Sequence, residues 1–333
     1  MTRTWFITGA NRGLGRAFTL AALAEGDRVV ATTRNPGAMT ELAHDRLTVL
    51  SLDVRERANV IASVDEAFAR MGTIDVIVNN AGYGLVGAVE ELTETQIRDQ
   101  MDTNFYGALW VCQAATPHLR TQGSGHIVQI STVGAVGSLP LFGMYNASKW
   151  ALEGFSASLA DELRPFGIAV TLAQMGGFDT DWAKSSMRFA TGITAYEDLR
   201  TTILGMPNYP PPSSAESTVA PTEPTAESAG TAATPASAAQ APTDSASIDQ
   251  QSPTFVEEPA TDTKSPGDTT ADTEPEWIEA RPEVAAAAVI ALVNMPHPPL
   301  RKIIGPGAHH MVSIALTQRR DDYARDTEFS WPA

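Results

Sequence analysis

Short apolar runs alternate with longer amphipathic stretches along the first 205 residues of the chain. Six runs have the length and β-branched content of buried strands, at residues 4–8, 28–33, 47–52, 74–78, 126–130 and 168–172. The segments between them are long enough for helices, most clearly at 95–119. Strands and helices that alternate at this spacing predict an α/β fold with a doubly wound parallel sheet and right-handed crossovers.

The alternating pattern stops near residue 206. Residues 207–276 are rich in Pro, Ala, Ser, Thr and acidic side chains, and large apolar residues are nearly absent. Such a composition buries too little apolar surface to offset chain entropy, so it predicts disorder. Apolar patterns resume beyond it, at 282–293, 300–305 and 308–320. We therefore expect one domain, formed by residues 1–206 and 277–333, that a disordered low-complexity insertion at 207–276 interrupts.

The acidic charge of the chain is concentrated in this segment. The whole chain has a formal net charge of −16, whereas residues 207–280 hold thirteen acidic residues and one lysine, a net charge of −12. The remainder is close to neutral for its size and has no basic run or stripe. A nucleic-acid partner is therefore not expected.

The other compositional features favour a cytoplasmic protein. The single cysteine, Cys112, lies in an apolar helical pattern and is expected to be a buried thiol in a reducing compartment. The first predicted strand begins at residue 4, which leaves no room for a signal peptide before it. The longest apolar run, 284–293, is half the length of a membrane span. The six histidines show no metal-ligand spacing, so neither a membrane partner nor a metal is expected.

A glycine-rich turn joins the first predicted strand to the first helix. Gly9, Gly13 and Gly15 have the spacing G-x-x-x-G-x-G. Glycines at such a turn let the backbone approach a pyrophosphate, whose negative charge the helix N-terminus stabilises. A tight turn without a ligand is the alternative, but the strand before it and the helix after it favour a dinucleotide site.

The end of the second strand indicates which dinucleotide binds. A carboxylate there accepts a hydrogen bond from the ribose 2′-hydroxyl of NAD, whereas an arginine accommodates the 2′-phosphate of NADP. This chain has Arg34 at that point and no acidic residue between Val29 and Pro36, and Arg12 lies in the glycine turn. The pattern favours NADP, although Arg34 alone is also typical of a solvated surface charge.

Tyr145 and Lys149 lie four residues apart in a helical pattern, so they project from one face of the helix. The pKa of free tyrosine is about 10, and a neighbouring cation lowers it towards the range in which proton transfer is efficient at neutral pH. Taken alone, the spacing is more typical of a solvated helix face. It gains weight from the dinucleotide motif in the same chain.

Together these motifs resemble those of the short-chain dehydrogenase/reductase family. The resemblance rests on Thr8-Gly-x-x-x-Gly-x-Gly15, Asp53-Val54, Asn79-Asn-Ala-Gly82, Asn104, Ser131 and Tyr145-x-x-x-Lys149, and it covers residues 1–205 closely. It implies a Rossmann-type fold and an oxidoreductase that interconverts a carbonyl and an alcohol by hydride transfer. The implied cofactor contacts are Gly9, Asn11, Arg12, Gly13, Leu14, Gly15, Arg34, Asp53, Val54, Asn80, Ala81, Gly82, Tyr145, Lys149, Phe178 and Thr180.

The resemblance also implies a catalytic set of four residues. Tyr145 exchanges a proton with the carbonyl oxygen, and Ser131 hydrogen-bonds that oxygen. Lys149 lowers the pKa of Tyr145 and binds the nicotinamide ribose. Asn104 holds a water that passes protons towards Lys149. The chain departs from the family at Met175, where a proline is usual, so the turn before Phe178 and Thr180 is expected to be less rigid.

The substrate is only coarsely indicated by the sequence. The segment 139–142 and the aromatic residues Phe178, Trp182 and Phe189 suit a small to medium apolar carbonyl or alcohol, and core packing or subunit contact explains them equally well. The resemblance implies a homo-oligomer, a dimer or a tetramer. An NADP(H)-sensing binding protein on the same fold is the alternative function, and it has no use for Tyr145 and Lys149 together.

Overall fold

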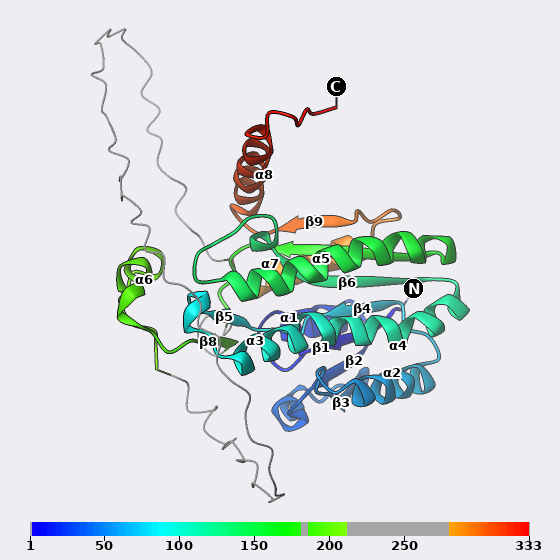
Figure 1. The fold of residues 1–333 in the computed structure, drawn as a ribbon. Helices are drawn as coiled ribbons and strands as arrows, with labels where there is room; N and C mark the ends of the chain where they lie inside the picture. Colours follow the sequence, from blue (N-terminus) through cyan, green and yellow to red (C-terminus); the bar gives the residue numbers. More distant parts are fainter. Residues whose placement is uncertain (1, 181–185, 212–279, 333) are drawn as a thin grey trace, which may run out of the picture. The chain divides into compact units, whose positions relative to one another are not determined.

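Seven parallel strands form the central sheet of the computed structural model, in the order β3-β2-β1-β4-β6-β7-β9 (Figure 1). The strands are β1 Thr4–Thr8, β2 Arg28–Thr33, β3 Leu47–Ser51, β4 Val76–Asn79, β6 Gly125–Thr132, β7 Ile168–Met175 and β9 Arg301–Ile304. The chain winds outwards from β1 to β3, returns to β4 and winds outwards again to β9. This order confirms the predicted doubly wound parallel α/β sheet.

The structure describes residues 2–180, 186–211 and 280–332, which belong to one compact unit. The insertion predicted at 207–276 lies outside the described residues from position 212 onwards, and so does Trp182. The chain beyond it completes the same sheet, because β9 pairs with β7 from Leu172↔Arg301 to Met175↔Ile304.

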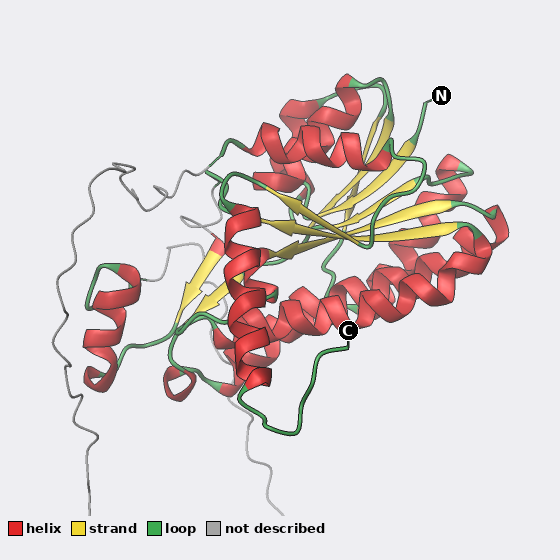
Figure 2. Ribbon diagram, turned by 90° about the horizontal axis from the view of Figure 1, so that it is seen from above, coloured by secondary structure: helices red, strands yellow, loops and turns green. Residues whose placement is uncertain are grey.

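Helices cover both faces of the sheet (Figure 2). Alternation along β1 explains the division, because successive side chains of a strand point to opposite faces. Ile7 packs with α1 and α7, whereas Phe6 packs with α2, α4 and α5. The helices are α1 Gly13–Ala24, α2 Arg57–Met71, α3 Glu94–Met101, α4 Gly107–Gln122, α5 Gly143–Leu163, α6 Glu197–Leu204, α7 Pro282–Val293 and α8 Ala308–Ala324. In the described part of the chain, no helix is long and apolar enough to cross a membrane.

The helix predicted at 95–119 is interrupted. A π-helical turn, Asp102–Tyr106, separates α3 from α4 and turns Asn104 into the interior. Such turns insert a residue into the helical ladder and are frequent at functional sites. Cys112, further along α4, is buried as expected, and burial raises the pKa of its thiol to about 12, so it stays protonated at neutral pH.

A second, two-stranded sheet was not predicted from the sequence. It pairs β5 Gly84–Val86 with β8 Met187–Phe189 in parallel. Three-residue strands are too short to show an alternating pattern, so only tertiary pairing reveals them. The segment that follows β8 leads to α6.

A buried ion pair fixes α6 to the core. Arg200 on α6 is 1% exposed, and its Nη1 donates a hydrogen bond to Glu91 Oε1 at 2.5 Å. The Tyr209 hydroxyl donates to Glu91 Oε2 at 2.6 Å, and the Ile193 amide donates to Oε1 at 2.9 Å. A buried charge is tolerated only when it is paired and hydrogen-bonded in this way. The pair therefore holds the segment between β8 and residue 211 in place.

Removing the charge of Glu91 is expected to destabilise the fold, because Arg200 is then left buried without a counter-ion. In Glu91→Gln we expect the free energy of unfolding, measured by urea denaturation, to fall by about 3–5 kcal/mol. The matched control is Glu94→Gln, which removes one partner of the exposed pair with Arg98 and is expected to leave the urea midpoint unchanged. Equal midpoints for the two variants would contradict this role of the buried pair.

Candidate active site

The residues that the sequence singles out meet at the carboxyl edge of the parallel sheet. The glycine turn follows β1, Asn80 follows β4, Ser131 lies at the end of β6, and Phe178 follows β7. β1 pairs with β2 on one side and with β4 on the other, which makes this the point where the strand order reverses. Ligands of open α/β sheets bind at such a point.

The glycine turn forms a cradle that side chains would fill. Gly9 and Gly13 have φ angles of 65° and 51°, a conformation that favours glycine. A Cβ atom on Gly15 would lie 2.3 Å from the Gly9 carbonyl oxygen. The turn leads directly into α1, whose first backbone amides have no partner within the helix. These residues therefore fit the pyrophosphate of a dinucleotide.

The segment after β4 is hydrogen-bonded to this turn. The Thr8 hydroxyl accepts hydrogen bonds from the amides of Asn80 and Ala81, both at 3.0 Å. The Asn80 side chain donates to the carbonyl oxygens of Thr8 and Gly9, at 2.9 and 3.1 Å. The side chain of Asn80 thus shapes the turn, and a ribose contact by Asn80, Ala81 and Gly82 stays a prediction.

The residues predicted for the adenosine end lie close together. Arg34 is exposed at the end of β2, and its charge acts on the Asp53 carboxylate beyond β3. The Asp53 carboxylate is paired with Arg55 at 2.7 Å. Burial raises the pKa of the Asp53 carboxyl, but the hydrogen bonds from Arg55 outweigh it and lower the pKa overall. Arg55 was not singled out from the sequence, although a cation two residues after Asp53 could have suggested that the two side chains pair.

Val54 and Arg12, two other predicted cofactor contacts, differ in their exposure to solvent. Val54 is buried and belongs to the core cluster beneath α4, against Gly107. Arg12 is exposed at the start of α1. Contacts of these two residues with a cofactor stay predictions, like those of Asn11 and Leu14.

Lys149 is a buried cation on α5. Its side chain is almost inaccessible, with 6% of the residue exposed, and its Nζ donates a hydrogen bond to the Ile130 carbonyl oxygen at 2.7 Å. Burial disfavours the charged form and lowers the pKa of Lys149 to about 8, while the charge of Glu153 acts in the opposite direction. Lys149 is therefore still largely protonated at neutral pH.

Tyr145 lies one turn before Lys149 on the same helix and is partly exposed. The expected lowering of its pKa is not present in this structure. Burial raises the pKa of Tyr145 to about 12, and the nearby Thr132 side chain lowers it in part. The reason is that Lys149 directs its ammonium to the Ile130 carbonyl, while the phenol is largely surrounded by protein.

Ser131, predicted to contact the carbonyl oxygen, and its neighbour Thr132 have different partners in the structure. The Ser131 hydroxyl points into the interior and donates to Glu153 Oε1 at 2.9 Å. The Thr132 hydroxyl accepts from the Gly134 amide at 3.2 Å, and the Thr132 side chain is close enough to the Tyr145 phenol to lower its pKa. Neighbouring residues of a strand point to opposite faces, so the two hydroxyls have different surroundings. The side chain that acts on the Tyr145 phenol is that of Thr132, a residue not named from the sequence.

Asn104 lies where the π-helical turn meets α5. Its Oδ1 accepts from the Tyr83 amide at 3.0 Å, and its Nδ2 donates to the Tyr83 carbonyl and the Ser148 hydroxyl, at 2.9 and 3.1 Å. Ser148 in turn donates to the Tyr145 carbonyl oxygen at 2.6 Å. A Cβ on Gly82 would lie 3.1 Å from Asn104 Oδ1 and 3.7 Å from Lys149 Nζ. The structure thus brings Asn104, Tyr145 and Lys149 together, while the water relay stays a prediction.

The segment after β7 faces the glycine turn. Met175 is buried at the end of β7, and the strand continues through the Gly176 amide, which donates to the Ile304 carbonyl at 2.8 Å. Phe178 forms a bridge to Ala280, and a Cβ on Gly13 would touch Thr180 at 3.7 Å. Backbone pairing thus holds the turn where a proline is absent.

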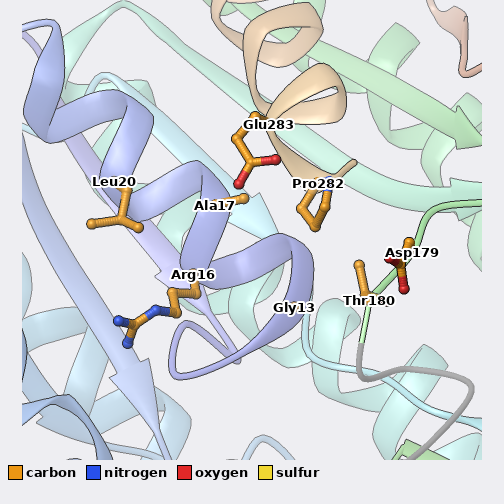
Figure 3. Close-up of a pocket in the computed structure, with 8 residues that line it drawn as sticks. All are labelled: Gly13, Arg16, Ala17, Leu20, Asp179, Thr180, Pro282 and Glu283. Atoms are coloured by element: carbon orange, nitrogen blue, oxygen red, sulfur yellow. The ribbon is translucent and has the colours of Figure 1, made fainter. Parts of the chain in front are cut away.

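A pocket of about 240 Å³ opens beside this turn (Figure 3). Thr180 faces Gly13 across it, whereas Arg16 points away from Thr180. The lining residues are Gly13, Arg16, Ala17, Leu20, Asp179, Thr180, Pro282 and Glu283. The start of α7 therefore borders the pocket beside the glycine turn.

An apolar cluster includes the residues that directly precede α5. Its buried members are Val86, Ala88 and Leu141, and the partly buried residues packed on them are Phe142, Met187, Phe189, Tyr196, Leu199, Ile203, Leu204 and Tyr209. Two of the predicted apolar elements, the segment 139–142 and Phe189, thus contribute to one cluster. Among residues 2–180, 186–211 and 280–332, no group of three or more His, Cys, Asp or Glu side chains could hold a metal ion.

Comparison with known proteins agrees with this geometry. The family model described as short chain dehydrogenase matches residues 3–190. Oxidoreductase BOA17 of Botryotinia fuckeliana is 42% identical over 201 residues, which cover 59% of this chain and 73% of that protein.

Solved structures agree as well. A short-chain dehydrogenase from Streptomyces avermitilis superposes with a TM-score of 0.72 at 29% identity, covering 97% of this chain and 95% of that one. An alcohol dehydrogenase from Thermococcus sibiricus, complexed with 5-hydroxy-NADP, gives a TM-score of 0.53 at 25% identity, covering 56% of this chain and 82% of that one. With the matching family model and this arrangement of the glycine turn, Tyr145 and Lys149, the chain belongs to the short-chain dehydrogenase family of nicotinamide-dependent oxidoreductases.

Proposed function

We propose that this enzyme is an NADP(H)-dependent oxidoreductase that interconverts an apolar aldehyde or ketone and the corresponding alcohol, with Tyr145 as the acid and base. The observation that carries the proposal is the pair of hydroxyls formed by Tyr145 and Thr132, one helical turn from the buried Lys149 and next to the glycine cradle. Such a pair can bind and protonate one carbonyl oxygen.

The nicotinamide supplies the hydride when it is bound. The chain supplies the proton: the pKa of Tyr145, about 12, keeps the phenol protonated at neutral pH, ready to donate to a carbonyl oxygen. The Thr132 hydroxyl donates a second hydrogen bond to the same oxygen and orients it. The ammonium of Lys149 stabilises the phenolate that forms as the proton leaves.

Asn104 contributes by position. It links the π-helical turn to Ser148, and Ser148 is hydrogen-bonded to the backbone of Tyr145. The Asn104 amide therefore links the π-helical turn to the start of α5. A fixed spacing between these two elements keeps the reacting groups aligned.

The preference for NADP rests on charge. Arg34 stands exposed at the end of β2, where an acidic residue would favour NAD, and Arg12 is exposed at the glycine turn. The acidic side chain beside Arg34, Asp53, is already paired with Arg55. The positive charges of Arg34 and Arg12 suit a 2′-phosphate.

The apolar substrate class rests on the cluster around Leu141 and Phe189. A binding surface made of apolar side chains favours an apolar substrate whose carbonyl is the only group that needs a hydrogen-bond partner. A cytoplasmic location and a homodimer or homotetramer stay predictions from the sequence.

Tyr145→Phe is expected to abolish turnover and keep cofactor binding, because only the proton is removed. We expect kcat to fall about 100-fold or more on a panel of apolar aldehydes and ketones. NADPH binding, measured by fluorescence titration, should stay unchanged. The control is Tyr323→Phe on the exposed face of α8, which should retain full activity. A variant at position 145 that keeps a tenth of the rate would exclude Tyr145 as the acid.

A second pair of variants distinguishes the roles of Thr132 and Ser131. Thr132→Val keeps the shape of the side chain and removes the hydroxyl, so kcat should fall about 100-fold, as it does when one donor to a developing oxyanion is lost. Ser131→Ala should cost much less, since that hydroxyl points to Glu153. Steady-state kinetics that show the larger loss in Ser131→Ala would return the carbonyl contact to Ser131.

Arg34→Asp is expected to reverse the cofactor preference. The new carboxylate repels a 2′-phosphate and accepts a hydrogen bond from a 2′-hydroxyl. The ratio of kcat/KM for NADPH to that for NADH should fall by at least about 100-fold, which corresponds to about 2.7 kcal/mol. Arg70→Asp, the same charge change at the far end of α2, is the control. An unchanged ratio in Arg34→Asp would remove Arg34 from the site.

A further inference from the structure

A buried carboxylate lies directly beneath the active site. Glu153 follows Lys149 by four residues on α5, as Lys149 follows Tyr145, so the three side chains share one face of the helix. Only 7% of Glu153 is exposed. The proposed chemistry does not use it.

Each oxygen of this carboxylate is held by the sheet. Ser131 Oγ and Gln174 Nε2 donate to Oε1, at 2.9 and 2.7 Å, from β6 and β7. Arg301 Nε donates to Oε2 at 3.0 Å from β9. All three partners are donors, so the arrangement suits an ionised carboxylate and not a protonated one. Glu153 is therefore a negative charge kept inside the protein.

The charge nearest to it in the reaction machinery is that of Lys149. This ammonium is buried, and its Nζ donates to the Ile130 carbonyl, a neutral partner. Desolvation favours its neutral form, and a carboxylate one helical turn away favours the charged form. Burial and the charge of Glu153 act on the pKa of Lys149 in these two opposite directions.

We propose that Glu153 is a positioning residue for the reaction, and that its fixed carboxylate keeps the ammonium of Lys149 charged so that Lys149 can stabilise the Tyr145 phenolate. The inference rests on the proposed roles of Lys149 and Tyr145. It also explains the orientation of Ser131, because the Ser131 hydroxyl donates a hydrogen bond to Glu153.

The other groups around α5 do not replace this charge. β9 contributes Arg301, a cation that pairs with Glu153, and α8 contributes Arg319, which stacks on the exposed Trp150 ring at 4.7 Å. The π-helical turn contributes the neutral amide of Asn104, and β7 contributes the neutral Gln174. Among the described residues, the charge that raises the pKa of Lys149 is that of Glu153.

A purely structural role would look different. If Glu153 only tied β9 to α5 through Arg301, its removal would loosen the sheet edge and leave the protonation of Lys149 unchanged. The decisive readout is therefore the titration midpoint of Lys149 itself. The chain has only four lysines, at positions 149, 184, 264 and 302, so their NMR signals can be resolved with isotope-labelled lysine.

The experiment titrates the cofactor-free enzyme by NMR, with the Lys149 signal assigned by its loss in Lys149→Arg. In Glu153→Gln we expect the midpoint of Lys149 to fall by about one pH unit or more. Glu153→Asp keeps the charge and should restore most of the difference. Glu162→Gln, at an exposed position of the same helix, is the control and should leave the midpoint unchanged.

Arg301→Met provides a test of opposite sign and does not depend on Glu153→Gln folding well. Removing the cation beside Glu153 should leave the midpoint of Lys149 at or above the wild-type value. A wild-type midpoint in Glu153→Gln, or a lowered one in Arg301→Met, would overturn the proposal.

Turnover provides the second readout. In the proposed mechanism reduction requires Lys149 to be charged, so the turnover rate should fall as the pH rises through the pKa of Lys149. In Glu153→Gln this fall in rate should occur at lower pH, by the same number of pH units as the NMR midpoint of Lys149 moves. If Tyr145→Phe proved active, the proposed function would fail, whereas the NMR titration would still decide whether Glu153 sets the charge of Lys149.

Discussion

The active site depends on a cation held inside the protein. An ammonium taken out of water loses its hydration, and the protein must replace that with fixed partners. Lys149 obtains a carbonyl from β6 and the field of a carboxylate from its own helix. Because Ile130, Ser131 and Thr132 are consecutive on β6, one strand end provides the Lys149 contact, the Glu153 contact and the Tyr145 contact.

The alternation of a strand explains how one short segment serves three purposes. The side chain of Ser131 points to Glu153 and that of Thr132 acts on Tyr145, while the carbonyl oxygen of Ile130 accepts a hydrogen bond from Lys149. Slipping β6 by one residue would exchange the two hydroxyls. The pairing of β6 with β7 over eight positions, from Gly125↔Ile168 to Thr132↔Met175, fixes the register against such a slip.

The sequence predicts the sheet and the general place of the site because these follow from local patterns. Buried parallel strands are continuous apolar runs, and the glycine spacing marks the turn after β1. The same reasoning assigns Tyr145 and Lys149 to one helix face, which the structure shows on α5.

Other features depend on contacts that a local pattern does not contain. Choosing between Ser131 and Thr132 requires knowing which side of β6 faces α5, and the pKa of Tyr145 depends on how much protein surrounds it. The pairing of Asp53 with Arg55 depends on the conformation of the turn that follows β3. The β5–β8 sheet joins residues about a hundred positions apart. These are tertiary properties.

The most direct test of the account is a crystal structure of the enzyme with NADPH and an unreactive apolar ketone. The account predicts that the ketone oxygen lies within hydrogen-bond distance, about 2.6–3.2 Å, of both Tyr145 Oη and Thr132 Oγ1. The Ser131 hydroxyl should remain on Glu153. A ketone oxygen bound by Ser131, with Thr132 turned away from Tyr145, would contradict it.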